Sequence, residues 1–340
     1  MTNTDFSRNV FFFGAGFSKA INAAYPTLKE LTTKLCKIYD EEISFVADYW
    51  RNEINDMYKS NIETLLTYLS STLPYKTPVQ MSTDDALYKD ITSRIAIYFN
   101  NELQTSKNDN CLPEVNKLMQ FILDDKSICI TLNYDVLLEN YLNNCALTRA
   151  KQIDFSNLYN APLTELNPTG NILFYDMNDP EPTPRDSLPD IIKLHGSINW
   201  GITADNSSIV YYIKNGDEDY RKSHLQTYII PPVLDKTNFY SNHILKAIWQ
   251  RAHNKLSNAE NIYIFGFSFP ETDYSIKFLF QSALKNNKTC NVYVINVEND
   301  LTELKKHYEK IFGPGKCNFD CCKNDQQIKL LTEKLYAGEK

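Results

Sequence analysis

Four short apolar runs recur along the chain, and each ends at small or polar residues. They lie at 10–13, 127–131, 262–265 and 291–295. Uninterrupted apolar runs of this length are typical of strands that are buried on both faces of a parallel sheet. Because helical stretches separate the runs, the pattern predicts an open α/β sheet, with a ligand site beyond the carboxyl ends of its strands.

A long helical stretch, about residues 27–125, lies between the first two predicted strands. It has the apolar periodicity of amphipathic helices, for example at 61–69, and it is too long for one crossover connection. We therefore expect a helical lobe inserted into the sheet domain. Two prolines predict a break in this lobe near 73–78.

Prolines and glycines predict two further segments of the chain, a loop and a C-terminal tail. Residues 161–190 contain six prolines and are expected to form a loop or lid. A turn with two glycines begins the segment 313–340, which is predicted to be a helical tail with a charged, solvated face. The sheet domain itself is predicted to span 1–312.

The composition narrows the class of protein. The 340 residues are 43% hydrophobic, enough for a sizeable core, and the formal net charge is −7. An acidic balance does not favour a surface that neutralises phosphates, so we expect no direct binding to nucleic acid. No apolar run is long enough for a signal peptide or a membrane span. We expect a soluble, cytoplasmic protein with no membrane contact.

The cysteines predict neither disulfides nor a metal site. Eight cysteines are scattered through the chain, as in proteins whose thiols stay reduced. Only Cys317, Cys321 and Cys322 cluster, and three thiols without a nearby histidine make a poor tetrahedral zinc site. We expect no bound metal and interpret these three residues as reduced cysteines on the surface.

The first candidate site follows directly on the first predicted strand and consists of Gly14, Ala15, Gly16, Phe17 and Ser18. Glycines at such a turn let the backbone approach a pyrophosphate, and the helix that follows offers unpaired N–H groups. An ordinary tight turn between a strand and a helix explains the same residues about equally well.

The second candidate site, Thr131, Asn133 and Asp135, lies at the end of the second predicted strand. Residues two apart on an extended segment project to the same side, so Asn133 and Asp135 can face one ligand. The alternative is an Asx turn or a helix N-cap made by Asp135. For this motif taken singly, the alternative is the better explanation.

The third candidate is His195, which follows an apolar pair and precedes Gly196. A histidine at a strand end is expected to be exposed to a cleft, and its ordinary pKa near neutrality suits a general base. A lone histidine is more often a structural hydrogen-bonding residue. The four other histidines have no comparable setting and are assigned to the surface or the scaffold.

The fourth candidate site repeats the strand, glycine and serine pattern with Gly266, Ser268 and Asp273. A second glycine turn at the same sheet edge can accept a ribose or a phosphate. Serine hydrolase chemistry is disfavoured, because Pro270 occupies the position of the last glycine in a nucleophile elbow.

The order of the four motifs, GAGFS, TLNYD, LHG and GFSFPETD, resembles the SIR2 (sirtuin-like) family, in particular the divergent bacterial branch that degrades NAD⁺ in defence against phage. The resemblance covers about residues 10–300 and is least specific in the helical stretch. It implies a Rossmann-like, mostly parallel sheet with a helical insertion lobe, and NAD⁺ as the substrate.

The resemblance also assigns roles to residues. Asn133 would orient the ribose and the attacking water, Asp135 would contact nicotinamide or stabilise the local network, and His195 would act as the base. The residues that would bind NAD⁺ are Gly14, Ala15, Gly16, Phe17, Ser18, Thr131, Gly266, Ser268, Asp273 and Asn296.

Two departures from the family bear on the reaction. Deacylating sirtuins carry two CxxC pairs that bind zinc, whereas this chain has no cysteine between Cys145 and Cys290. The arginine-bearing segment after the first glycine turn is also missing. Both departures weaken the case for an acyl-lysine deacylase and leave cleavage of the nicotinamide–ribose bond intact, since this cleavage expels a neutral ring and needs no strong acid at the leaving group.

We therefore expect an NAD⁺ glycohydrolase that acts as an abortive-infection effector against phage. The alternatives are an NAD-dependent deacylase or ADP-ribosyltransferase, and a non-catalytic module that binds NAD or ADP-ribose. By the resemblance, activation would come from homo-oligomerisation or from a protein partner, such as an ATPase or helicase-like chain or a phage-sensing subunit.

Overall fold

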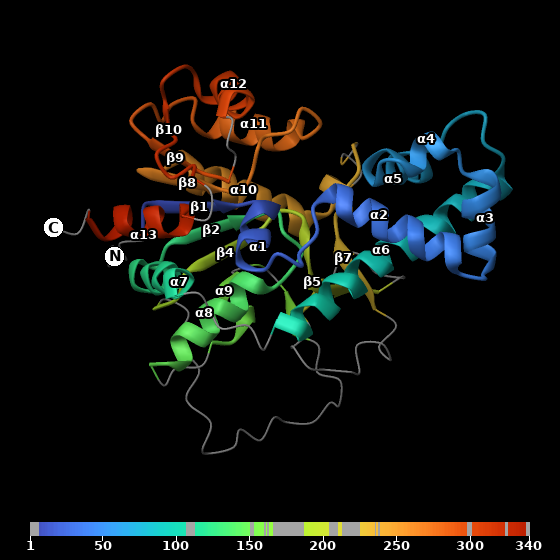
Figure 1. Cartoon of the computed structure of the whole chain (residues 1–340), viewed down its shortest axis with the longest axis horizontal. Coiled ribbons are helices and arrows are strands. Elements are labelled where there is room, and N and C mark those ends of the chain that lie inside the picture. Colours follow the sequence, from blue (N-terminus) through green and yellow to red (C-terminus); the bar gives the residue numbers. More distant parts are fainter. Residues whose placement is uncertain are drawn as a thin grey trace, which may run out of the picture.

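A computed structural model describes most of the chain and shows a doubly wound α/β domain with a helical lobe at one end (Figure 1). The described residues are 7–106, 113–149, 153–159, 161, 163–165, 187–203, 210–212, 225–234, 236, 239–297, 301–323 and 326–337. Most of the predicted lid at 161–190 therefore lies outside the described residues.

The central sheet has six parallel strands in the order β10-β9-β8-β1-β2-β4. All four strands predicted from the apolar runs are confirmed. The strands are β1 (Asn9–Phe13), β2 (Ile128–Thr131), β4 (Asp190–Lys193), β8 (Asn261–Phe265), β9 (Asn291–Ile295) and β10 (Cys317–Asn318). The predicted Rossmann-like α/β fold is confirmed, because the chain winds outward from β1 in both directions.

The strand order reverses between β1 and β8, which lie side by side in the middle of the sheet. In open α/β sheets a crevice forms beyond the carboxyl ends of the strands at this switch point. The residues after Phe13 and Phe265 lie at this place, and they are the first and fourth candidate sites.

Helices cover both faces of the sheet (Figure 1). One layer contains α1 (Ala15–Ile21), α7 (Pro113–Asp125), α8 (Leu137–Leu147) and α13 (Gln327–Ala337). The other contains α10 (His243–Ser257), α11 (Tyr274–Ala283) and α12 (Leu301–Phe312). Two short helices, α9 (Phe155–Tyr159) and the 3₁₀ helix η3 (Phe239–Ser241), complete the described helices around the sheet.

The helical lobe has a hydrophobic core of its own. It consists of α2 (Leu28–Glu41), α3 (Phe45–Glu53), α4 (Asp56–Lys59), α5 (Ile62–Ser70) and α6 (Pro78–Ser106). A capping box of Thr27 and Glu30 begins α2, and Pro78 begins α6 after the predicted break. Helix α7 was predicted within the lobe, but its side chains Val115, Leu118 and Ile122 pack in the core of the sheet domain.

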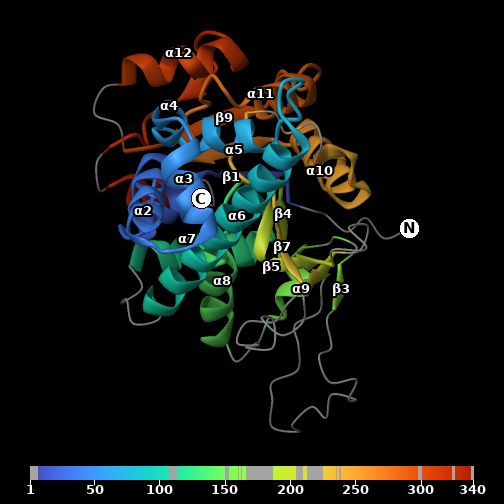
Figure 2. The ribbon, with the colours of Figure 1, turned by 90° about the vertical axis from the view of Figure 1, so that its right-hand side faces the viewer.

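A second, four-stranded sheet joins the lobe to the main sheet, and no apolar run predicted it (Figure 2). Its strands are β3 (Thr164–Glu165), β5 (Gly196–Ile202), β6 (Tyr211–Tyr212) and β7 (Gln226–Ile229). Strand β5 begins directly after His195. At Gly196, φ is +75° and an added Cβ would lie 2.2 Å from the Tyr228 carbonyl oxygen, so only glycine fits this junction between the two sheets.

The C-terminal segment is part of the domain rather than a separate tail. Strand β10 pairs with β9, and α13 packs against α7 with Ile328, Leu331 and Leu335 in the main core. The expectation of surface cysteines is wrong, because Cys321 and Cys322 are buried and Cys317 is half-buried. They are free thiols, and burial raises the pKa of Cys317 to about 12. Among the described helices, none is long and apolar enough to cross a membrane.

Candidate functional site

The two glycine turns lie in direct contact at the switch point. The Gly16 amide donates to the Gly266 carbonyl at 3.0 Å, and the Gly14 amide donates to the Phe265 carbonyl at 2.9 Å. An added Cβ on Gly266, where φ is +65°, would lie 2.4 Å from the Gly16 carbonyl carbon. The glycines are therefore required by the packing of one turn on the other, a role that sequence reasoning did not assign to them.

Asn133 is fixed to the first glycine turn by its side-chain amide. Its Nδ2 donates to the Gly14 carbonyl at 3.0 Å and to Ser18 Oγ at 2.9 Å. Thr131 Oγ1 accepts the Asn133 backbone amide at 3.0 Å and donates to the Phe13 carbonyl. Among the described residues none donates to Asn133 Oδ1. The half-buried side chain thus has a fixed orientation and an acceptor left for a ligand.

Asp135 makes the Asx turn that was weighed for it, and its second oxygen is bonded to the first glycine turn. One oxygen accepts from Ser18 Oγ at 2.8 Å, and the other accepts the Leu137 amide at 3.1 Å in an Asx turn at the start of α8. Burial raises the pKa of Asp135, although Lys193, Ser18 and the Leu137 amide act against this rise. Because both of its oxygens are occupied, Asp135 acts by orienting the Ser18 hydroxyl, which in turn accepts a hydrogen bond from Asn133.

Lys193 extends this network into the core. Its ammonium donates to the Asp135 backbone carbonyl and pairs with Glu139 at 3.0 Å, and both side chains of the pair are 1% exposed. Glu139 also accepts from the Tyr159 hydroxyl at 2.9 Å. A buried lysine needs such partners, because an uncompensated charge in the core is strongly unfavourable.

His195 is buried, in contrast to the exposed position expected from the sequence. The residue lies in the chain between β4 and β5, its ring is 6.4 Å from the Trp249 ring, and its Nε2 has no hydrogen-bond partner among the described residues. Burial lowers the pKa of His195 to about 4, while Asp273 acts to raise it and Lys236 acts to lower it. At neutral pH the imidazole is therefore uncharged and able to accept a proton.

One backbone segment connects His195 to the Asn133 region. The Ile230 amide donates to the His195 carbonyl at 2.8 Å, and the Tyr134 hydroxyl donates to the Ile230 carbonyl at 2.6 Å. Because Tyr134 adjoins Asn133, the second and third motifs lie at the same edge of the sheet as the two glycine turns.

The other candidate residues differ in their burial and in their contacts with the glycine turns and Asn133. Phe17 is buried in the core against Phe13 and Phe265, so it supports the turn from within. Ala15 is exposed at the start of α1. Ser268 is connected by its carbonyl to His307 at 3.1 Å, and Asn296 Oδ1 accepts the Val297 amide at 2.8 Å. In the described part of the chain, the side chains of Ser268 and Asn296 make no hydrogen bond to another candidate residue.

Sequence reasoning missed two charged residues that interact with the candidate residue Asp273. Lys236 lies after β7 and pairs with Asp273 at 3.2 Å, and Glu63 of α5 is half-buried close to this pair. The polar face of the 61–69 helix was the only signal for Glu63. Lys236 had none, since it follows an irregular segment with no periodicity.

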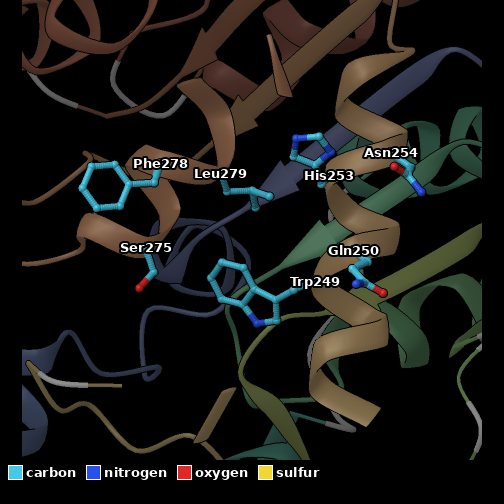
Figure 3. A pocket seen from close by; sticks show the side chains of 7 residues that line it. All are labelled: Trp249, Gln250, His253, Asn254, Ser275, Phe278 and Leu279. Atoms are coloured by element: carbon cyan, nitrogen blue, oxygen red, sulfur yellow. The ribbon is translucent and has the colours of Figure 1, made fainter. Parts of the chain in front are cut away.

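A shallow groove of about 590 Å³ lies between α10 and α11 (Figure 3). Its lining residues are Trp249, Gln250, His253, Asn254, Ser275, Phe278 and Leu279. The Trp249 indole N–H donates to the Leu194 carbonyl at 3.0 Å, which joins this lining side chain to the backbone just before His195. None of the candidate residues lines the groove.

A family model described as a SIR2-like domain matches residues 127–313, more than half of the chain. The chain belongs to the SIR2-like domain family. The match contains Asn133, Asp135, His195 and the second glycine turn. The predicted family is thereby confirmed, although this match does not identify the anti-phage branch.

Solved structures of Sir2 proteins resemble the SIR2-like chain over nearly its whole length, at low identity. A Sir2 homolog in complex with NAD is 13% identical with a TM-score of 0.47, and the alignment covers 99% of this chain and 92% of that chain. A structure concerned with the mechanism and regulation of Sir2 enzymes is 12% identical with a TM-score of 0.44, covering 99% and 95%. No curated protein matches the sequence.

The described part of this SIR2-like domain offers no cluster of three or more histidine, cysteine or acidic side chains that suits a metal ion. Its polar site is made instead of hydroxyl, amide and carboxylate groups on the β1–α1 turn, the end of β2 and the β8–α11 turn. Such groups can orient a sugar and a water molecule.

Proposed function

We propose that this SIR2-like chain binds NAD⁺ at the switch point between β1 and β8 and hydrolyses its nicotinamide–ribose bond. The observation that carries the proposal is the hydrogen-bonded unit of Ser18, Asn133 and Asp135, which fixes the Asn133 amide on the first glycine turn. In a SIR2-like domain this position corresponds to the motif that lines the nicotinamide–ribose pocket.

The pyrophosphate would lie over the first glycine turn. The amides of Gly14 and Gly16 are already bonded to the β8 turn, whereas the Ala15 amide donates to no described residue. We assign the Ala15 N–H, at the start of α1, to a phosphate oxygen. Gly266 and Ser268 would bind the adenosine half, with Asn296 beside them.

The reaction would proceed through an oxocarbenium-like state of the ribose. The C1′–N1 bond breaks and its electron pair leaves with nicotinamide, which becomes neutral. Asn133 Oδ1 orients the water that bonds to C1′, and His195 takes a proton from that water, leaving ADP-ribose. Preorganised polar groups in a site that excludes water contribute most to such a step.

The direct test is to incubate the purified protein with NAD⁺ and to follow nicotinamide and ADP-ribose by chromatography. We expect Asn133→Ala to lower turnover by about 10²-fold or more, with a much smaller effect on NAD⁺ binding. His195→Ala should lower turnover comparably. The matched controls are Asn286→Ala and His243→Ala, whose residues are exposed and are not among the candidate site residues. Equal turnover in all four variants and the wild type would refute the assignment.

A second experiment tests the pyrophosphate position. Proline is tolerated at the first residue of a helix, and Gly14 before it has extended φ and ψ, so Ala15→Pro removes one N–H with little change in fold. We expect the Kd for NAD⁺, measured by calorimetry, to rise about tenfold, as for the loss of one hydrogen bond to a charged group. Ala15→Ser keeps the N–H and should bind like the wild type.

A role in defence against phage is proposed from the resemblance to the anti-phage branch of the SIR2 family. Depletion of NAD⁺ would stop the metabolism of an infected cell, and this supports a cytoplasmic anti-phage effector that is activated by self-association or a partner chain. The test is survival of phage-challenged bacteria that express the wild type or Asn133→Ala, with cellular NAD⁺ measured in parallel. Protection that persists in the variant would contradict this role.

A further inference from the structure

The second glycine turn contains a phenylalanine in a backbone conformation that this residue type rarely adopts. At Phe269, φ is +51°, in the left-handed region, and the side chain is buried. This region is unfavourable for a bulky residue, and the proline that follows, Pro270, restricts the residue before it to extended conformations. The surrounding structure must therefore hold the turn in place.

Helix α12, which packs beside α11 (Figure 1), holds the turn by two hydrogen bonds to its backbone. The Tyr308 hydroxyl donates to the Phe267 carbonyl at 2.7 Å. His307 Nδ1 lies 3.1 Å from the Ser268 carbonyl oxygen, and Nδ1 carries the proton of this bond because a carbonyl can only accept. Two neighbouring residues of one helix thus bind the two carbonyls that precede Phe269.

Aromatic packing fixes the same turn. The centroid of the Phe269 ring lies 5.0 Å from that of Tyr308 and 4.8 Å from that of Phe267, in edge-to-face contacts. Two further rings contact Phe269, those of Phe280 and Phe312. Phe267 and Phe269 are buried on either side of Ser268, which is half-buried. The turn therefore anchors its apolar residues in this cluster and leaves Ser268 partly accessible.

The start of the turn is held by backbone groups instead. The Gly266 amide donates to the Ile295 carbonyl at 2.9 Å, and the Gly266 carbonyl accepts the Gly16 amide at 3.0 Å. The sheet edge and the first glycine turn thus fix Gly266, whereas side chains of α12 fix the two residues that follow it. Substitutions in α12 can therefore loosen the later part of the turn and leave Gly266 in place.

We propose that His307 and Tyr308 are positioning residues for the adenosine half of NAD⁺, because they hold the second glycine turn in the conformation that binds it. This inference rests on the proposed function, in which Gly266 and Ser268 bind the adenosine half. Each α12 side chain acts through a backbone carbonyl of the turn. When a donor is removed, the unfavourable conformation relaxes, fewer molecules have a competent turn, and the apparent affinity falls by the same factor.

The experiment measures binding of ADP-ribose by calorimetry, since this probe carries the adenosine half and lacks the bond that would be cleaved. Tyr308→Phe removes only a hydroxyl, and we expect the Kd to rise about fivefold, the factor that corresponds to one lost hydrogen bond. His307→Leu should have a similar effect. In both variants, kcat for nicotinamide release at saturating NAD⁺ should change by less than about twofold, because Asn133 and His195 are unaltered.

Matched variants separate positioning from stability. His307→Asn keeps an N–H donor at a similar distance from the backbone and should bind ADP-ribose like the wild type. Tyr293→Phe, at a half-buried tyrosine of β9, and His243→Leu, at an exposed histidine, should leave the Kd unchanged. Loss of packing alone would lower the temperature of unfolding without changing the Kd of the folded protein.

The proposal is overturned if Tyr308→Phe and His307→Leu bind ADP-ribose like the wild type, or if they lower kcat and not the affinity. Should His307→Leu fail to fold, Tyr308→Phe carries the test alone. If the Kd rises as expected while no form of the protein releases nicotinamide, the proposed hydrolysis fails and the positioning role stands. A wild type that binds no ADP-ribose would overturn both.

Discussion

The two halves of the candidate site are built in opposite ways. Around Asn133, each donor has an acceptor, and Ser18, Asp135 and the glycine turns form one continuous network. Around His195, by contrast, the buried ring nitrogen Nε2 has no hydrogen-bond partner among the residues that the structure describes. The comparison teaches that hydrogen bonds within the chain fix the first half, whereas the second half holds a buried imidazole mainly by packing.

Removing the contact between the two glycine turns should cost the most stability. Gly266→Ala places a Cβ against the Gly16 backbone at a left-handed φ, and we expect the free energy of unfolding to fall by about 4 kcal/mol. Urea denaturation measures this. At Gly313, φ is +89° and nothing lies within 4 Å, so Gly313→Ala carries the backbone strain alone and should cost about 1 kcal/mol. Similar losses in the two variants would show that the turns are not packed as described.

The second largest loss of stability is expected when the buried ion pair of Lys193 and Glu139 is broken. Lys193→Met leaves the Glu139 charge without its partner in the core and should cost about 3 kcal/mol in urea denaturation. Adding Glu139→Gln should restore most of this stability, because neither side chain then carries a charge. The exposed pair of Lys89 and Asp85 provides the control, since Lys89→Met should change stability by less than about 0.5 kcal/mol.

Protonation of His195 should make the stability of the protein fall at acid pH. The folded pKa of about 4 is below the ordinary value of 6.5, so the unfolded chain binds more protons between these values, and stability is lost as pH falls through this window. Between pH 7 and pH 5 the loss from His195 should be about 2 kcal/mol. His195→Gln should remove this part of the slope, while exposed His243→Gln should keep it. A slope unchanged by His195→Gln would mean that the imidazole is not held neutral.

The smallest effect is expected at a single hydroxyl. Ser18→Ala removes the group that donates to Asp135 and accepts from Asn133, and a loss of about 1 kcal/mol is the usual size for a buried hydrogen bond. Thermal unfolding, with Ser60→Ala as an exposed control, measures it. Turnover of NAD⁺ should also fall, because the Asn133 amide loses one of its two acceptors. In free-energy terms, we expect the rise in the activation barrier to exceed the loss of stability. Unchanged turnover would separate Ser18 from the reaction.

The sequence predicted the parts of the fold that local patterns specify. Apolar runs identified β1, β2, β8 and β9, and the residues that follow three of them lie together at the switch point. The second sheet was not predicted, because β5 carries polar residues and glycines and its partner strands have only two to four residues. Strand β10 has two residues, too few for a pattern, so the burial of Cys321 and Cys322 was missed.

In the candidate site, too, local sequence patterns predicted some residues and missed those that depend on contacts between distant parts of the chain. Asn133 and Ser18 lie in motifs with a recognisable spacing, but the burial of His195 depends on β5, β7 and Trp249, which come from distant parts of the chain. Lys236, which follows the irregular residues after β7, meets Asp273 from a position 37 residues away in the chain. Contacts of this kind have no periodicity, and only the folded chain reveals them.

Strand β10 and helix α13 have a consequence for biosynthesis. All proposed site residues precede Val297, yet the edge of the sheet and the cover of α7 are supplied by residues 317–337. While those residues are still inside the ribosome, the nascent chain has the proposed site residues but an unfinished core, and chains fold as whole domains. The domain is therefore expected to mature only after helix α13 has been released.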